Sequence, residues 1–215
     1  MRQQRLALSF SPRASHKPRM IYLDYQATTP LAPEVRDAML PWLVGEGEGD
    51  GFANPASPYR AGRAASVAVE MARDAVAALL PPGGRVFFTS GATEAINWAL
   101  FCGARVKPGG MGGSAIEHAA TLQCIEAQGG TLLPVGTDGL LQRPDAARLP
   151  EGGIVATMLL NNEIGTIQPV AAYAEAAHAR GSWLLCDAVQ GFGRIVIPEG
   201  PDLIAVTAHK IHGPK

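Results

Sequence analysis

The chain has 215 residues, a net charge of −1 and 47% hydrophobic residues. This length suits one large domain, or one domain and part of another, and the hydrophobic share is enough to build a core. The near-zero charge argues against a nucleic-acid partner or an anionic membrane surface, and no apolar run reaches the length of a membrane span.

The first 19 residues differ from the rest in composition. They contain five basic residues and several serines, and no acidic residue occurs before Asp24. Such a composition occurs in organellar transit peptides, but a disordered leader or a start codon placed too early explains it equally well, with Met20 as the natural start. We interpret 1–19 as a disordered leader, followed by an N-terminal segment over 20–50 and a large domain over 51–215.

The segment from residue 20 predicts one short strand and two helices. An apolar stretch at 21–24 reads as a strand, and Pro33 suits the first turn of a helix that runs to about residue 43. Ser57 is the expected N-cap of a longer helix, with Pro58 beside it. Apolar residues recur along this helix at helical spacing until the segment 81–84 ends it.

From residue 85 onward, expected strands alternate with expected helices. The strands occupy 86–89, 114–117, 131–135, 154–159, 183–186 and 203–206. The helices occupy 93–104, 119–127 and 170–179. Apolar strands that alternate with helices predict an α/β fold, with a mostly parallel sheet covered by helices on both faces. Ligands of such sheets bind at the carboxyl ends of the strands.

The last of these strand ends carries Lys210, where a charged ammonium is costly to desolvate. A desolvated amine has a lowered pKa and can form an imine with an aldehyde such as pyridoxal phosphate. The neighbouring Thr207 and His209 could then donate hydrogen bonds to its phosphate. Taken alone, a solvated loop lysine is the simpler interpretation.

Gly91, Ala92 and Thr93 follow the expected strand 86–89 and open a helix. The free N–H groups of the first helical turn, together with the Thr93 hydroxyl, suit a phosphate. The alternative is an ordinary helix cap, which this motif alone favours.

Polar residues also follow three other expected strands. His118 could stack on an aromatic ring or move protons, or it could be a structural histidine. The amides at 161–162 could bind a phenolate oxygen or form an Asx turn. Asp187, with Gln190 three residues on, could pair with a pyridinium N–H or with an arginine. One cofactor site explains all five strand ends more simply than five separate structural roles.

These motifs, taken in order, resemble those of cysteine desulfurases, in the class V aminotransferase-like group of fold-type I pyridoxal-phosphate enzymes. The matching stretches are 22–30, 54–57, 89–94, 117–118, 161–165, 187–190 and 209–215. The last stretch is similar to the branch that serves general iron–sulfur assembly. The chain departs from the family at Thr207 and Ala208, where Ser-Gly is usual, and at His212, where tyrosine is usual.

The resemblance implies a role for each of the central side chains. Lys210 would bind the cofactor covalently and move the substrate Cα proton, while His118 would stack on the ring and assist proton transfer. Asp187 would hold the pyridine nitrogen. Gln190 and Asn162 would bond the phenolic oxygen, with Asn162 also near the substrate carboxylate.

The resemblance also implies the residues around the phosphate and the substrate. Those expected to hold the phosphate are Ala92, Thr93, Thr207 and His209, with Ala208 in the same turn. Those expected at the substrate entrance are Ala27, Thr28 and Thr29. No metal site is predicted.

The implied reaction converts L-cysteine to L-alanine and leaves the sulfur on an enzyme cysteine as a persulfide, for iron–sulfur cluster assembly. The implied partners are a second copy of the chain and an iron–sulfur scaffold or sulfur-acceptor protein. Alternatives are a selenocysteine lyase, another class V enzyme, or a cofactor-binding module without turnover.

The three cysteines of the chain match no nucleophile of the family. Cys102, Cys124 and Cys186 form no CxxC pair and no even set, which fits a reducing compartment and a cytoplasmic location. We interpret all three as buried, inert thiols. The family's nucleophilic cysteine, carboxylate-binding arginine and small domain have no match here, so we expect the N-terminal half of an enzyme that is inactive alone.

Overall fold

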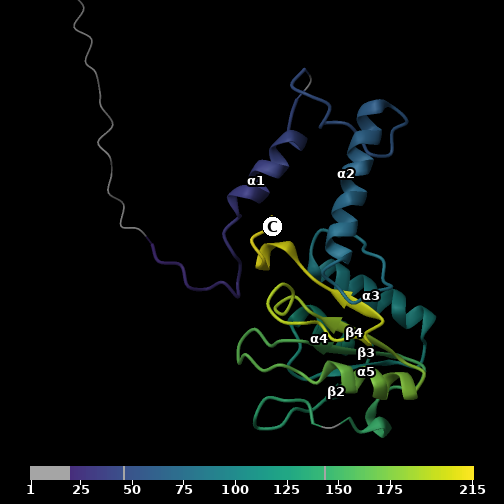
Figure 1. The fold of residues 1–215 in the computed structure, drawn as a ribbon. Helices are drawn as coiled ribbons and strands as arrows, with labels where there is room; N and C mark the ends of the chain where they lie inside the picture. The colour runs from purple at the N-terminus through teal and green to yellow at the C-terminus, as the bar shows by residue number, and fades with distance from the viewer. Residues whose placement is uncertain (1–19, 46, 143) are drawn as a thin grey trace, which may run out of the picture.

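The structure is a computed structural model that describes residues 20–45, 47–142 and 144–215. The expectation of a disordered leader over 1–19 lies outside the described residues. Figure 1 shows a sheet with helices on both sides, and two helices, α1 and α2, that extend away from it.

Five parallel strands form a single sheet in the order β2-β1-β3-β4-β5. The strands are β1 (Met111–Ser114), β2 (Thr131–Leu133), β3 (Ile154–Met158), β4 (Trp183–Asp187) and β5 (Leu203–Ala205). The α-helices are α1 (Pro33–Met39), α2 (Arg60–Ala77), α3 (Ala92–Val106), α4 (Ala119–Ala127) and α5 (Val170–Ala179). Short 3-10 turns occupy Leu40–Trp42, Ala146–Arg148 and Ala208–Lys210. The expected α/β fold is confirmed.

The two faces of the sheet have separate hydrophobic cores. Ile154 and Ala156 of β3 pack with α3 and α4, whereas Val155 packs with α5 on the opposite face. Because successive side chains of a strand point to opposite faces, a strand covered on both sides must be apolar throughout. All five residues of β3 are buried, and four of them are apolar, with Thr157 as the exception.

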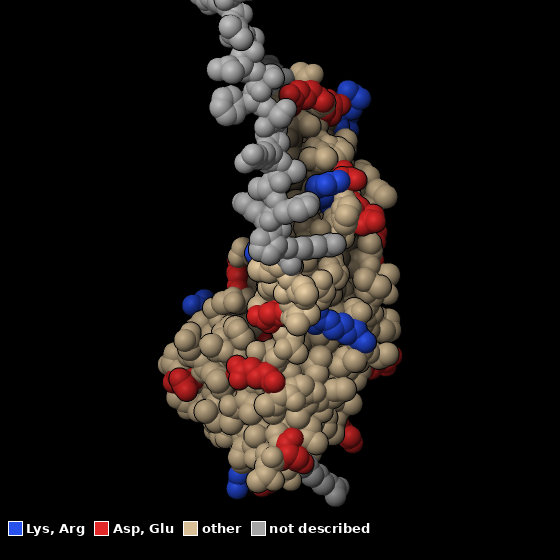
Figure 2. All heavy atoms as spheres, turned by 90° about the vertical axis from the view of Figure 1, so that its left-hand side faces the viewer, with Lys and Arg blue, Asp and Glu red and all other residues tan. Residues whose placement is uncertain are grey.

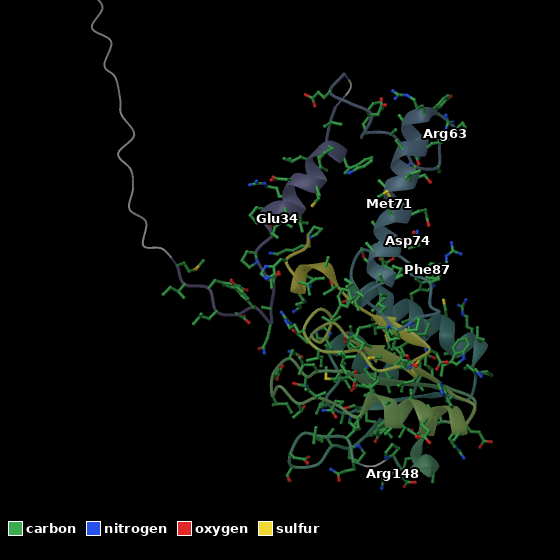
Figure 3. All side chains as sticks on the ribbon, in the orientation of Figure 1. Glu34, Arg63, Met71, Asp74, Phe87 and Arg148 are labelled. Atoms are coloured by element: carbon green, nitrogen blue, oxygen red, sulfur yellow. The ribbon has the colours of Figure 1, made fainter. Side chains whose placement is uncertain are left out.

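The expected strand at 86–89 is wrong, since this segment is extended coil with no strand beside it. Phe87 and Phe88 are 60% and 53% exposed, and Figure 3 shows Phe87 near the end of α2. A strand forms only where a neighbour completes its hydrogen-bond ladder. In the sheet that the structure describes, β5 is the last strand and has no partner on its outer side.

The first strand of the sheet lies three residues earlier than expected, at Met111–Ser114 rather than 114–117. This strand could not be recognised from the sequence, because its two glycines have no side chains to form an apolar pattern. Gly113 is required by packing: a Cβ there would lie 2.5 Å from Cδ1 of Ile125 and 3.1 Å from the carbonyl oxygen of Ala156. Glu117 and His118 therefore lie in the turn that leads to α4.

The N-terminal elements also differ from expectation. Residues 21–24 form no strand, and the helix that begins at Pro33 changes to a 3-10 turn at Leu40–Trp42, because Pro41 has no N–H to continue it. Helix α2 begins at Arg60 with Tyr59 as its N-cap. Ser57 instead closes a local turn, donating its N–H to the Asn54 carbonyl at 3.0 Å.

Helix α2 buries little of its apolar surface. Only Gly62 and Ala65 of its residues are buried among those the structure describes. Met71, one of the apolar residues at helical spacing, is 67% exposed, and it projects from α2 together with Asp74 in Figure 3. The periodicity correctly indicates a helix, although much of its apolar side is exposed in the described part of the chain.

The surface of the molecule carries charges of both signs. On the face shown in Figure 2, acidic and basic side chains are interspersed among uncharged ones. Among the described helices, none is both long enough and apolar enough to cross a membrane.

Leu184 tests how strongly the α5 face of the sheet stabilises the fold. Its side chain is 0% exposed in that core. We expect Leu184→Ala to lower the free energy of unfolding by about 2–5 kcal/mol, because it removes buried methyl groups and leaves a cavity. Urea unfolding of the purified chain measures this change.

Leu43 is the matched control, because it is 70% exposed. Leu43→Ala should change the free energy of unfolding by no more than about 0.5 kcal/mol. Equal losses in the two variants would contradict the described core.

Candidate functional site

Most of the predicted site residues line one cavity of ≈ 2080 Å³, which runs from the carboxyl ends of the strands along β5, the segment 80–88 and α3. The lining includes Ala27, Thr28, Ala92, Thr93, His118, Asn162, Asp187, Gln190, Thr207, Ala208, His209 and Lys210. Thr29 does not line the cavity. It is buried beside it, where its Oγ1 donates to the His209 carbonyl at 2.9 Å and accepts from the His212 N–H at 2.7 Å.

The start of α3 faces the cavity with free backbone donors. Gly91 is its N-cap, no side chain caps the helix, and a Cβ at Gly91 would project into open space. Thr93 is exposed, so its hydroxyl is not used as the helix cap considered from the sequence. The first-turn N–H groups and the positive end of the helix dipole suit an anion in this space.

Glu94 stabilises this turn from the outside. Its Oε2 accepts the Ser90 N–H at 2.6 Å and the Ser90 hydroxyl at 2.7 Å. Both hydrogen bonds lower the pKa of Glu94. The turn is thus fixed by a neighbouring carboxylate, and the Gly91–Ala92–Thr93 backbone remains available to a ligand.

Asp187 is the last residue of β4 and is 7% exposed. Its Oδ1 accepts the Val189 N–H at 3.0 Å. Burial raises the pKa of Asp187, while the Val189 N–H, His118 and Lys210 oppose that rise. No arginine forms an ion pair with Asp187 in the described part of the chain, so the structural partner considered from the sequence is not found there. A cationic N–H in the cavity would stabilise its charge.

Lys210 lies in the 3-10 turn that follows β5, and its Nζ points at the N-terminal segment. The ammonium donates to the carbonyl oxygens of Gln26 and Ala27, the latter at 2.9 Å. Burial lowers the pKa of Lys210, Arg194 lowers it further, and Asp24 and Asp187 raise it. The lysine is therefore partly desolvated rather than free in a loop, which favours a nucleophilic amine.

The N-terminal segment crosses the lysine turn as a strap, defined here as residues 26–32. The Thr29 N–H donates to the His209 carbonyl at 2.8 Å, and the Ala32 N–H donates to the His212 carbonyl at 3.0 Å. His209 Nδ1 lies 3.1 Å from Thr28 Oγ1. Burial lowers the pKa of His209, and Lys210 and Lys215 lower it further. The strap brings Ala27 and Thr28 to the cavity from about 180 residues away in sequence.

Gln190 and Arg194 connect this strap to the lysine. Gln190 Nε2 donates to the Gln26 carbonyl at 2.9 Å, and its Oε1 accepts from Arg194 Nη1 at 3.2 Å. Arg194 Nη2 also donates to the Lys210 carbonyl at 2.8 Å. The sequence analysis missed Arg194, which follows no strand end and belongs to no recognisable motif.

One ring nitrogen of His118 makes a structural hydrogen bond, and the ring also borders the cavity. Its Nδ1 accepts the Ala120 N–H at 3.2 Å and caps α4, so the neutral ring carries its proton on Nε2. The ring also lines the cavity. The structural and the functional interpretations of this histidine are therefore compatible.

The two neighbouring amides have different roles. Asn161 is buried: its Oδ1 accepts the N–H groups of Glu163 and Ile164 at 2.8 and 3.0 Å, and its Nδ2 donates to the Ile116 carbonyl. This is the Asx turn considered from the sequence. Asn162 lines the cavity, so it is the amide that a ligand can reach.

Together these groups fit pyridoxal phosphate. The cavity has anion donors at the start of α3 and near Thr207, a buried acid at Asp187, a partly desolvated amine at Lys210 and a histidine ring between strand ends. A phosphate, a pyridine nitrogen and an aldehyde each have a chemically matched residue. Within the described residues, no group of three or more histidine, cysteine or carboxylate side chains is arranged to hold a metal ion.

Comparison with known proteins gives consistent matches over most of the chain. The model of the aminotransferase class-V family matches residues 21–215. A cysteine desulfurase from Cereibacter sphaeroides is 40% identical over 210 residues, which cover 91% of this chain and 53% of that protein. A human cysteine desulfurase is 38% identical over 214 residues, which cover 92% of this chain and 45% of that protein.

Two solved structures show the same arrangement. A NifS-like protein from Rickettsia africae ESF-5 aligns with a TM-score of 0.77 and 29% identity, over 91% of this chain and 56% of its own. SspA in complex with cysteine aligns with a TM-score of 0.76 and 28% identity, over 90% and 58%. The chain spans about half the length of the curated relatives it matches.

Asp187 provides a test of this electrostatic environment without any ligand. Its pKa is higher in the folded chain than in the unfolded chain, so the folded chain loses stability as pH rises through that pKa. Asp187→Asn keeps an acceptor for the Val189 N–H but removes the charge. We expect the variant to unfold at a higher temperature than the parent at pH 8, with the difference disappearing below about pH 4.

Asp138→Asn is the matched control, because Oδ1 of Asp138 accepts the Leu140 N–H at 3.0 Å in an exposed turn of the same kind. Thermal unfolding of this variant should follow the parent at every pH. If Asp187→Asn also followed the parent, Asp187 would not be the destabilised buried acid described above.

Proposed function

This chain belongs to the aminotransferase class-V family, and we propose that it forms the cofactor-binding part of a pyridoxal-phosphate-dependent cysteine desulfurase. The observation that carries the proposal is the convergence of Lys210, Asp187 and the start of α3 on one cavity. Members of this family and of the cysteine desulfurases depend on pyridoxal phosphate, which supports the choice of cofactor.

We propose that two groups of donors bind the phosphate. The N–H groups of Ala92 and Thr93 and the Thr93 hydroxyl lie on one side, and Thr207 and His209 lie on the other. The lowered pKa of His209 means that its ring binds as a neutral imidazole at neutral pH, with one N–H to donate. Ala208 then contributes backbone rather than side chain, which is why it can replace the usual glycine.

When bound, pyridoxal phosphate supplies an electron sink for the bonds at the substrate Cα. Asp187 would hold a proton on the pyridine nitrogen, because a buried carboxylate stabilises a cationic N–H. Gln190 and Asn162 would orient the ring through its phenolic oxygen. His118 would cover one face of the ring.

The proton at the substrate Cα would be moved by Lys210. Burial lowers the pKa of its amine, which favours the neutral form that can accept a proton. His118 presents Nε2 to the same cavity and could carry a proton to or from the reacting sulfur. The strap residues Ala27 to Thr29 would limit access to this space.

For the substrate we propose L-cysteine. The similar proteins named cysteine desulfurases, and the similar structure of SspA in complex with cysteine, support this choice. The C–S bond of the substrate would break, a protein thiol would take up the sulfur as a persulfide, and L-alanine would leave. We also propose a homodimer, a sulfur-acceptor or iron–sulfur scaffold partner and a cytoplasmic location.

The thiols of the described chain are poor candidates for the nucleophile. Cys124 and Cys186 are buried, and burial raises the pKa of both. Cys102 is exposed on α3 and also borders the cavity, which corrects the expectation that it is buried, but it lies ten residues along the helix from Ala92, about 15 Å from the proposed phosphate site. The thiol that accepts the sulfur would have to reach the substrate in the cavity, and a buried thiol cannot do so.

The cofactor proposal predicts a single site of covalent labelling. After incubation with pyridoxal phosphate and reduction with borohydride, peptide mass spectrometry should find the adduct on Lys210, because this amine is partly desolvated beside the proposed phosphate site. Lys210→Ala should abolish the adduct and leave the circular dichroism spectrum unchanged.

Lys107→Ala is the matched control for this labelling. Lys107 Nζ donates to the Gly181 carbonyl at 2.8 Å, outside the cavity. This variant should be labelled at Lys210 as fully as the parent. An adduct distributed evenly over the lysines, or retained in Lys210→Ala, would refute the assignment.

The 215-residue chain alone should not turn over L-cysteine. Persulfide formation needs a thiolate within reach of the substrate sulfur, and the described cysteines are buried or lie on the helix α3. Alanine release with added pyridoxal phosphate and a reductant should not exceed release by the free cofactor. Turnover above that level, abolished by Lys210→Ala, would contradict this prediction.

A further inference from the structure

Glu117 is a buried carboxyl that the chemistry above does not use. It lies in the turn between β1 and α4 and is 5% exposed. Its Oε1 accepts the Met158 N–H at 2.8 Å. Its Oε2 is buried and has no hydrogen-bond partner among the described residues. Because an unpartnered buried oxygen is costly, this position needs an explanation beyond packing.

The hydrogen bond of Glu117 joins two parts of the cavity. On one side, Glu117 directly precedes His118, whose ring caps α4. On the other side, Met158 is the last residue of β3 and pairs in register with Asp187 of β4. The next residue, Leu159, donates its N–H to the Asp187 carbonyl at 2.8 Å.

We propose that Glu117 is a positioning residue of the cofactor site, in which its buried carboxyl ties the segment carrying His118 to the strand ends that carry Asp187. The inference rests on the proposed function, because His118 and Asp187 would both contact the bound ring. Glu117 itself need not touch the cofactor. Its contribution is to fix the separation between the two residues that do.

The carboxyl performs this role in its neutral form. Burial raises the pKa of Glu117 to about 8, the charge of Asp187 adds to the rise, and the Met158 N–H opposes it. The titratable groups that face it are Asp187 and Cys186 on β4, with His118 adjacent in the chain. His118 and Lys210 lower the pKa of Asp187, whereas the charge of Asp187 raises the pKa of Glu117. The proton therefore belongs on Glu117, and the negative charge stays on Asp187 for the pyridine nitrogen.

Two substitutions distinguish a neutral Glu117 carboxyl that connects the two segments by a hydrogen bond from a side chain that only fills space. Glu117→Gln keeps the length, the acceptor and the neutral charge, while Glu117→Asp is too short to reach the Met158 N–H. Glu126→Gln, an exposed glutamate on α4, is the control. All are compared with the parent chain.

The first readout is the melting temperature of the cofactor-free chain between pH 5 and pH 9. The folded pKa of Glu117 lies above the unfolded one, so the parent loses stability as pH rises through about 8. Glu117→Gln cannot ionise, so its melting temperature should exceed that of the parent by an amount that grows between about pH 5 and pH 8 and then levels off. Glu126→Gln should follow the parent. A Glu117→Gln chain that also follows the parent would overturn the neutral carboxyl.

The second readout is the affinity for pyridoxal phosphate at pH 7, followed by absorbance. Glu117→Gln should bind as the parent does, and Glu117→Asp should bind about tenfold more weakly, as expected for one lost hydrogen bond. Equal binding by Glu117→Asp and the parent would overturn the positioning role alone. Failure of the parent to bind would overturn the proposed function, and the positioning role with it, while the melting temperatures still decide the charge of Glu117.

Discussion

The structure depends on the burial of a parallel sheet on both of its faces. Strands such as β3 and β4 are enclosed by helices and are mostly apolar, so charged side chains are placed where the strands end. Parallel strands all end at the same edge, and this edge receives Asp187, Asn162 and Thr207 together. The same low dielectric that stabilises the core makes each charge at this edge costly unless it finds a partner.

The strap adds an N-terminal wall to that edge. Residues 26–32 bind the turn at 209–212 through backbone hydrogen bonds, so the N-terminal segment and the lysine turn are positioned together. The carbonyl oxygens of Gln26 and Ala27 satisfy the ammonium of Lys210, and Arg194 joins Gln190 to the lysine carbonyl. His212 adopts a left-handed conformation, with φ of 64°, to donate its N–H to Thr29 in this contact. The Lys210 ammonium is thus hydrogen-bonded to neutral backbone carbonyl groups, which a ligand can replace.

Much of the fold could be predicted because it follows from local pattern. The runs that became β3, β4 and β5 are apolar and were placed within a residue or two. Two expected strands, at 21–24 and 86–89, do not form, and a third was placed three residues too late, because a strand is defined by its neighbours. The Val-Phe-Phe-Thr run at 86–89 has the composition of a strand, but no neighbouring strand pairs with it among the described residues. The reverse holds for β1, which is rich in glycine but pairs with β2 and β3. Ser57 was likewise a suitable N-cap residue, but it lies in a turn with Asn54, and α2 begins later, at Arg60.

The site residues were predictable as a set and less so in their contacts. Residue type at a strand end identified Asp187 and Lys210, whereas Arg194 and Glu117 act through hydrogen bonds that only the folded chain shows. The adjacent amides illustrate the limit, because sequence could not tell that Asn161 is used by the backbone and Asn162 is free.

The contact between His118 and α4 restricts how this histidine can exchange protons. Its Nδ1 is occupied by the Ala120 N–H, so only Nε2, on the cavity side, is open to exchange. The ring cannot pass a proton from one nitrogen to the other, as a relay histidine would, without first giving up the helix cap. Acid–base behaviour at this position is therefore linked to the integrity of the first turn of α4: fraying of that turn would change the tautomer as well as the helix.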